Sequence, residues 1–246
     1  MARGKDLYIG STLVHHIYNE SDKIYHIYKG SQEIWRDRLY NKGETIFEKQ
    51  IDGEYSVELD KGRYDVILVG GCGQAAMRGV YDDKGYGSGG GSGGAFIGRV
   101  VIPQGTYTVT VGKANNNTRA QSGNTQNLPP TDTTIYNTSI GNLIIVGGGG
   151  SAAAYNSVGA AGAAPIIDAS VTVVETTLST AGNAGHYNSG GKGSAAPAYC
   201  AGGASVYNNY GTGQGCRTSE YAFNRSWVNG TGGYVKIVYV EDDLQS

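Results

Sequence analysis

Runs of apolar residues, some of them alternating with polar residues, predict short β-strands along most of the chain. From Tyr64 to Val69 both alternating sets of positions contain apolar residues, which predicts a strand buried on both faces. In the segment 106–111 the tyrosine and valine side chains would share one face and the threonines the other. The runs 143–146 and 234–240 predict two further strands. No segment repeats apolar residues with a helical period over three turns, so little or no α-helix is expected.

A turn sequence, Pro103-Gln104-Gly105, separates two of the predicted strands. One strand covers residues 99–102, before the turn, and the other covers residues 106–111, after it. Two strands joined by so short a turn ordinarily pair with one another. Residues 98–112 are therefore expected to form a β-hairpin.

Glycine runs lie between the predicted strands, and glycine makes up 41 of the 246 residues. In several runs it recurs every third residue, as at Gly159 and Gly162 and at Gly182 and Gly185. The polyproline-II helix has three residues per turn and no internal hydrogen bonds, so buried helices of this type must bond to their neighbours. We expect a mainly β fold in which β-sandwich-like strands are combined with a bundle of glycine-rich polyproline-II-type helices. Flexible Gly/Ser-rich loops are the alternative.

Charged residues mark a boundary within the chain, because they are frequent up to residue 84 and sparse from 85 to 233. Between residues 7 and 40, short β-branched and aromatic runs alternate with turn residues, which predicts a small β-module. Such a module has too little apolar surface to be stable alone. We therefore expect an N-terminal β attachment module, residues 1–50, and a glycine-rich body with recognition loops, residues 51–246.

The charge pattern also limits the partners of the chain. The net charge is −2 and the basic residues form no stripe, which argues against nucleic acid as a partner. No run approaches 18 apolar residues, so no membrane insertion is expected. The first residues lack the apolar stretch of a secretory signal, and maturation in a reducing cytoplasm is expected.

Histidines and cysteines are the residues that would hold a metal ion. They are His15, His16, His26, His186, Cys72, Cys200 and Cys216. The three N-terminal histidines have no carboxylate or cysteine at ligand spacing, and the cysteines lack the spacing of a zinc site. Any disulfide scheme leaves one of the three cysteines over. Exposed strand histidines and small buried cysteines are the simpler interpretation, so no metal is expected.

Two glycine-rich runs match functional motifs. Residues 71–76 follow a predicted strand and match the dinucleotide fingerprint, but the segment after them cannot form the helix that would hold a pyrophosphate. Residues 90–94 match the nucleophile elbow inside a glycine tract, with no buried strand before them. Acidic pairs for glycoside hydrolysis are hard to assemble from the few acids between 85 and 233. Neither enzymatic activity nor a cofactor is expected.

Polar and aromatic inserts interrupt the glycine tracts. Tyrosine and tryptophan with asparagine and serine are the mixture that recognition loops use, because rigid rings supply contact area and amides supply adaptable hydrogen bonds. The alternative is that these residues cap the glycine helices and pack on each other. The candidate receptor-binding residues are Tyr155, Asn156, His186, Tyr187, Asn188, Tyr207, Asn208, Asn209, Tyr210, Tyr221, Phe223 and Trp227.

Taken together, the small N-terminal β-module, the glycine tracts linked by aromatic inserts and the terminal strand 232–239 resemble the glycine-rich domain of bacteriophage tail proteins. The phrase 27–35 is similar to the opening segments of many phage virion proteins. The body, residues 55–240, resembles the tail-fibre-tip adhesins of T-even-like phages, in which polyglycine-II helices present variable loops to the bacterial receptor. It also resembles the glycine-rich domain of lymphoma-kinase-type receptors.

The resemblance implies a phage tail-tip or tail-fibre adhesin, located in the virion and assembled in the host cytoplasm. Residues 1–50 would attach it to other tail or virion proteins, and the inserts would bind a host surface receptor, either a protein or a glycan. The resemblance further implies that copies of the chain associate as a homo-oligomer. The alternative is a structural virion component, such as a tail or head-fibre protein, that binds no receptor. An antifreeze role would need a flat face of small residues, which the bulky tyrosines interrupt.

Overall fold

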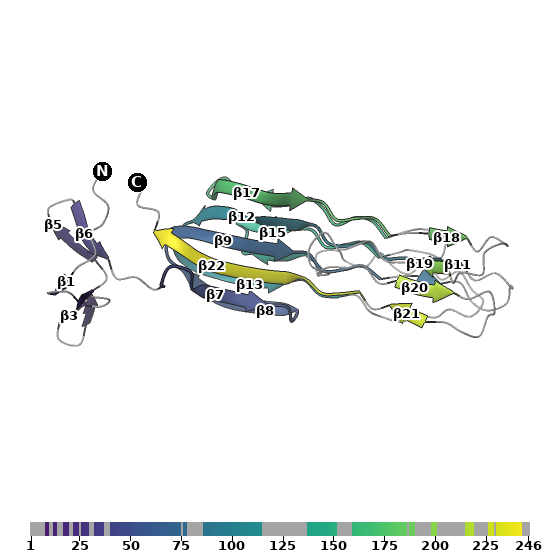
Figure 1. Ribbon diagram of the computed structural model, residues 1–246, viewed down its shortest axis with the longest axis horizontal. Helices are drawn as coiled ribbons and strands as arrows, with labels where there is room; N and C mark the ends of the chain where they lie inside the picture. Colours follow the sequence, from purple (N-terminus) through teal and green to yellow (C-terminus); the bar gives the residue numbers. More distant parts are fainter. Residues whose placement is uncertain are drawn as a thin grey trace.

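The computed structural model describes the body of the chain as a mainly β protein with two five-stranded antiparallel sheets (Figure 1). The described residues contain no α-helix, as expected from the apolar pattern. They are residues 8–9, 12–13, 17–19, 22–24, 26–29, 32–36, 40–74, 76–77, 86–114, 137–151, 159–185, 187–189, 198–200, 215–218, 226–228 and 230–242.

The first large sheet has the strand order β17-β12-β9-β22-β7, and every neighbouring pair is antiparallel. Its strands are β7 (Thr45–Lys49), β9 (Gly62–Val69), β12 (Ala95–Ile102), β17 (Thr172–Thr180) and β22 (Tyr234–Asp242). In β9, one face is buried and the residues of the other face are only half-buried. The prediction of a strand buried on both faces is therefore half right, because Arg63 and Asp65 need access to water.

The second large sheet has the strand order β16-β15-β14-β13-β8. Its strands are β8 (Gly53–Leu59), β13 (Gly105–Val111), β14 (Thr138–Ile140), β15 (Ile144–Val146) and β16 (Ile166–Ile167). In β13, Val109 and Val111 are buried, whereas Thr106 and Thr108 are exposed. The predicted division of this strand into an apolar and a threonine face is confirmed.

A single hydrophobic cluster contains buried side chains of both large sheets. From the first sheet it takes Leu68 and Phe96, and from the second it takes Leu59, Val109 and Ile144, all of them fully buried. At about 25 cal/mol per Å² of buried apolar surface, contacts of this kind are the main stabilising contribution in the described body.

The expected hairpin 98–112 is wrong, although both of its strands exist. Strand β12 pairs with β9 and β17, and strand β13 pairs with β8 and β14. The turn 103–104 therefore takes the chain from one large sheet to the other, as the turn 60–61 does between β8 and β9. Both β12 and β13 carry a buried apolar face, and each face is covered when the strands enter different sheets.

Three tyrosines brace the chain where it enters a strand. The hydroxyl of Tyr64 donates a hydrogen bond to the carbonyl oxygen of Asp60 at 2.8 Å, and that of Tyr107 donates to Pro103 at 2.7 Å. Tyr55 makes the same contact with the carbonyl four residues before it, at 3.0 Å. The first two tyrosines thus hold the two turns through which the chain changes sheets, which gives a structural use for part of the high tyrosine content.

The short strands expected between residues 7 and 40 form three two-stranded hairpins, β1–β2, β3–β4 and β5–β6. Their bounds are β1 (Tyr8–Ile9), β2 (Thr12–Leu13), β3 (Ile17–Asn19), β4 (Asp22–Ile24), β5 (His26–Lys29) and β6 (Gln32–Arg36). The attachment role of residues 1–50 stays a prediction.

Two small sheets complete the described fold, with the orders β10-β11-β18 and β19-β20-β21. Their strands are β10 (Ala76–Met77), β11 (Tyr86–Ser88), β18 (Tyr187–Ser189), β19 (Ala198–Cys200), β20 (Gly215–Thr218) and β21 (Ser226–Val228). Figure 1 shows them beyond the large sheets, at the end opposite the arrowhead of β22. We call this the distal end.

A surface ion pair links β7 to β22 and predicts a response to acid. Glu48 accepts a hydrogen bond from the Tyr234 hydroxyl at 2.6 Å and lies 3.0 Å from the ammonium of Lys236. The Tyr234 hydrogen bond, and then Lys236, lower the pKa of the Glu48 carboxyl. The stabilisation is therefore present above the ordinary glutamate pKa of about 4.3 and is lost as the pH falls through the lower folded value.

We expect Glu48→Gln to weaken this part of the acid dependence of stability. Urea titrations of both proteins at a series of pH values would measure it. The two stability curves should converge as the pH falls below the ordinary glutamate range, and a constant gap between them would contradict the prediction.

Candidate functional site

Glycine-rich segments connect the large sheets to the distal end, and we call them the glycine tracts. Figure 1 shows them running side by side between β9, β12, β15, β17 and β22 on one side and the small sheets on the other. Among the described residues they are assigned to neither helix nor strand. The tracts are residues 70–74, 89–94, 112–114, 147–151, 159–164, 181–185 and 230–233.

Backbone hydrogen bonds join the tracts laterally, and they recur every third residue. Gly70 and Gly73 donate to the carbonyls of Gly94 and Gly91, both at 3.0 Å. Gly91 and Gly94 in turn donate to the tract 147–151, both at 2.9 Å. The tract 159–164 donates to 89–94 through residues three apart, and it accepts from 181–185 with the same spacing. These bonds satisfy backbone groups that neither sheet nor helix pairing satisfies.

Tract 89–94 is the centre of this arrangement, because it bonds to the tracts 70–74, 147–151, 159–164 and 181–185. All of its residues are buried. Its one hydroxyl, on Ser92, is fully buried and accepts a hydrogen bond from the backbone N–H of Asn183 at 2.8 Å. A nucleophile elbow exposes its serine, so the buried position of Ser92 agrees with treating that motif as a chance match.

Burial in tract 159–164 has a period of three. Gly159 and Gly162 are buried, whereas the four alanines of the tract are exposed. A β-carbon placed on Gly162 would lie 2.5 Å from the carbonyl oxygen of Gly147, far inside van der Waals contact. Glycine is required at every third position because only there does the backbone of the next tract approach so closely.

The run that resembles a dinucleotide fingerprint belongs to the same structure. Gly71 and Gly73 lie in the tract 70–74, and strand β10 follows at Ala76. Gly73 donates to Gly91, and a β-carbon on it would lie 1.9 Å from the carbonyl oxygen of Gly150. No helix begins among the described residues of this run.

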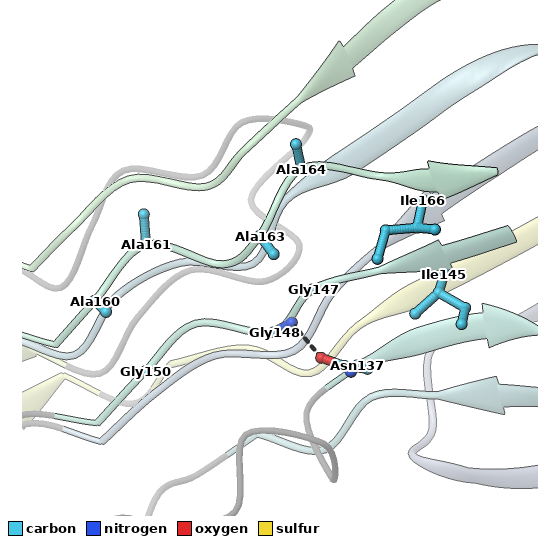
Figure 2. Close-up of a pocket in the computed structure, with 10 residues that line it drawn as sticks. All are labelled: Asn137, Ile145, Gly147, Gly148, Gly150, Ala160, Ala161, Ala163, Ala164 and Ile166. Carbon is cyan, nitrogen blue, oxygen red and sulfur yellow. Dashed lines mark hydrogen bonds between the residues drawn. The ribbon is translucent and has the colours of Figure 1, made fainter.

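An apolar groove of about 240 Å³ lies beside the tract 159–164 (Figure 2). Ala160, Ala161, Ala163 and Ala164 line one wall, together with the exposed side chain of Ile166. Across from them, the side-chain oxygen of Asn137 accepts a hydrogen bond from the backbone N–H of Gly148 at 2.9 Å. The lining residues include no acid, base or nucleophile, so the groove itself offers contact surface and no reactive group.

Three of the predicted receptor-binding residues lie on described strands at the distal end. In the sheet β10-β11-β18, Tyr187 and Asn188 pair with Ser88 and Gly87. In the sheet β19-β20-β21, Trp227 lies opposite Cys216. Strand β18 contacts β19 and strand β11 contacts β20, so the two small sheets are neighbours. The structure thus brings these three residues to one end of the molecule although forty positions separate Tyr187 from Trp227 in the sequence.

The other nine predicted receptor-binding residues lie outside the described residues, so their placement stays a prediction. They are Tyr155, Asn156, His186, Tyr207, Asn208, Asn209, Tyr210, Tyr221 and Phe223. Sequence reasoning missed the groove of Figure 2. The signal that could have found it is the repeat Gly-Ala-Ala from 159 to 164, which places the small side chains on the outside of the tract.

Several described side chains away from the distal end have shifted pKa values. Burial raises the pKa of Tyr40, which precedes β7, and of Tyr107 in β13, and hydrogen bonds from Ser170 lower the pKa of Asp168. Nowhere in the described ranges do three His, Cys, Asp or Glu residues cluster as metal ligands. No helix in the described part of the chain could cross a membrane.

A family model described as a glycine-rich domain matches residues 49–240. The chain belongs to this glycine-rich domain family. The match begins at the last residue of β7 and ends within β22, so it covers the glycine tracts, the distal strands and every strand of the large sheets from β8 onward. A search among curated proteins finds no match. Family membership therefore establishes the domain and leaves its ligand open.

Proposed function

We propose that this glycine-rich domain is a bacteriophage tail-tip or tail-fibre adhesin that binds a host surface receptor at its distal end. The observation that carries the proposal is the laterally bonded set of glycine tracts, which ends in two small sheets bearing Tyr187, Asn188 and Trp227. A rigid support for aromatic and amide residues is what a preorganised binding surface requires.

In this proposal the glycine tracts are polyproline-II-type helices that pack as a bundle. Three properties support the assignment. Lateral hydrogen bonds recur every third residue, and so does burial in the tract 159–164. A β-carbon added to most of the tract glycines would lie only 1.9–2.5 Å from a backbone carbonyl oxygen of a neighbouring tract. The two large sheets with their common hydrophobic cluster would form a β-sandwich at the other end. Each helix is held on several sides, so the distal strands lose little entropy on binding.

The adhesin would be mounted on the virion through residues 1–50 and would meet a protein or a glycan with its aromatic inserts. Flat aromatic rings stack on sugar faces and also act as hot spots in protein interfaces. Several copies on one particle would strengthen binding by avidity. No cofactor, metal ion or nucleic acid is required for this role.

The experiment is whole-cell binding of the full-length chain, fused to a fluorescent protein, across a panel of bacterial strains. A variant with alanine at Tyr207, Tyr210, Phe223 and Trp227 should lose at least tenfold in binding, because hot-spot aromatics each contribute about 1 kcal/mol or more. The matched control replaces four exposed apolar residues away from the distal end with alanine: Ile51, Ile166, Val173 and Val174.

Strain-selective binding that the distal variant loses and the control variant keeps would support the adhesin. Equal loss of binding and of melting temperature in the distal variant would instead assign these rings to structural packing. If the folded protein binds no strain but co-purifies with other virion proteins, the chain would be a structural virion component.

A further inference from the structure

Two cysteines face each other across the strands of the sheet β19-β20-β21. The antiparallel register of β19 and β20 places Cys200 directly opposite Cys216. On the other side of β20, the register places Trp227 opposite the same cysteine. Cys200, Cys216 and Trp227 therefore occupy one row of register positions across three strands.

This register meets the geometric requirement for a disulfide bond. Directly opposed residues of an antiparallel pair have Cα atoms about 4.5–5.5 Å apart. Disulfides span Cα separations of about 4.4–6.8 Å. Both kinds of opposed pair, hydrogen-bonded and non-hydrogen-bonded, therefore lie within this range without movement of the backbone. The third cysteine, Cys72, is fully buried in the glycine tract 70–74. Among the three pairings that three cysteines allow, the strand register thus favours one.

We infer that Cys200 and Cys216 form a disulfide bond when the protein meets an oxidising solution. A small disulfide such as oxidised glutathione is the oxidant. The thiolate of one cysteine attacks a sulfur of the small disulfide, which forms a mixed disulfide and releases one small thiolate. The thiolate of the second cysteine then attacks the protein sulfur of the mixed disulfide, which closes the Cys200–Cys216 bond and releases the second small thiolate. Two protein thiols are oxidised, the small disulfide is reduced to two thiols, and these take up the two protons.

The bond would act as a clamp at the base of a long insert. Fifteen residues separate the two cysteines in the sequence, and closing a loop of that length favours the folded state by about a hundredfold in the folding equilibrium. The enclosed segment includes Tyr207 and Tyr210, which the sequence predicts as receptor-binding residues. A reducing cytoplasm keeps such thiols reduced, so the disulfide would form after release from the host. This consequence rests on the proposed function.

The test uses the full-length chain with Trp35→Phe, which leaves Trp227 as its one tryptophan. The reduced protein is exposed to an excess of oxidised glutathione, alkylated under denaturing conditions and mapped by mass spectrometry of its unreduced peptides. We expect one linked peptide pair joining Cys200 to Cys216, with Cys72 alkylated. We also expect the fluorescence of Trp227 to fall on oxidation, since disulfides quench a neighbouring indole, and to recover with dithiothreitol.

Two variants make the mapping decisive. Cys72→Ala should keep both the linked peptide and the fluorescence change, whereas Cys216→Ser should lose both. Stable glutathione adducts on Cys200 and Cys216, a bond to Cys72, or disulfide-linked dimers would overturn the inference. The mapping needs no receptor, so a disulfide without cell binding would count against the adhesin alone, and cell binding without the disulfide would count against the clamp alone.

Discussion

Replacing Gly91 with alanine is expected to destabilise the protein by about 3 kcal/mol or more, at the upper end of the effects of overpacking. Gly91 lies in the central tract 89–94, and its added β-carbon would be 1.9 Å from the carbonyl oxygen of Ala160. A flexible side chain could move out of the way, but a backbone carbonyl of a neighbouring tract cannot. Relief of the clash would separate the tracts and strain the bond from Gly91 to Gly150, which is 2.9 Å long.

The matched control is Ala161→Ser, which also adds one heavy atom within the tracts. Ala161 is exposed, so the added hydroxyl points to water and the expected change is within about 0.5 kcal/mol. Urea unfolding of the two variants and the parent measures the difference, with far-UV circular dichroism as the probe. If Gly91→Ala cost no more than Ala161→Ser, the tracts would have to be loosely held, and they could not preorganise the distal end.

The spacing of the glycines in the sequence predicts part of the structure of the tracts, but not all of it. The three-residue spacing of Gly159 and Gly162 in the sequence matches the period of burial in the tract 159–164. The spacing could not indicate which tracts are neighbours, because every tract presents similar glycine edges. The parallel direction of 159–164 against 89–94 and the antiparallel direction of 70–74 against it depend on where the strands enter and leave the sheets.

The strands themselves were predictable where the apolar pattern was strong, as in β9, β13, β15 and β22. Their partners were not, and the expected hairpin 98–112 shows the reason. Local sequence favours pairing across a short turn, but β12 pairs with β9 and β13 pairs with β8, two strands that lie much earlier in the chain. Covering two apolar faces at once outweighs the local preference. Which strands pair can therefore be predicted only when all strands of both sheets are considered together.

At the distal end, too, the sequence predicted candidate residues but not which strands and residues are paired. The aromatic composition of the inserts predicted Tyr187, Asn188 and Trp227 as surface candidates, and the strand ladders bring them to one end. The opposition of Cys200 and Cys216 could not be predicted, because the register of short strands β19 and β20 follows from no apolar alternation. Spacing alone left all cysteine pairings open.

The second large effect is expected at Tyr64, where alanine should cost about 3–5 kcal/mol, as for other large aromatic residues removed from a core. Tyr64 is fully buried in β9, and its ring packs edge-on against that of Tyr239 with centroids 5.6 Å apart. Its hydroxyl also donates to the carbonyl of Asp60 at the turn where the chain changes sheets. Alanine removes the ring, the aromatic contact and the brace together.

Phenylalanine at Tyr64 separates the brace from the packing, since it removes only the hydroxyl. We expect Tyr64→Phe to cost about 1–2 kcal/mol, because the bond to Asp60 is buried and water cannot replace it. Tyr55→Phe removes the equivalent bond to Ile51 at an exposed site, and there the expected cost is within about 0.5 kcal/mol. Urea midpoints of the three variants give the comparison. Equal costs for the two phenylalanine variants would mean that the Tyr64 hydroxyl does not hold the turn, and that its ring alone stabilises the place where the chain passes between the large sheets.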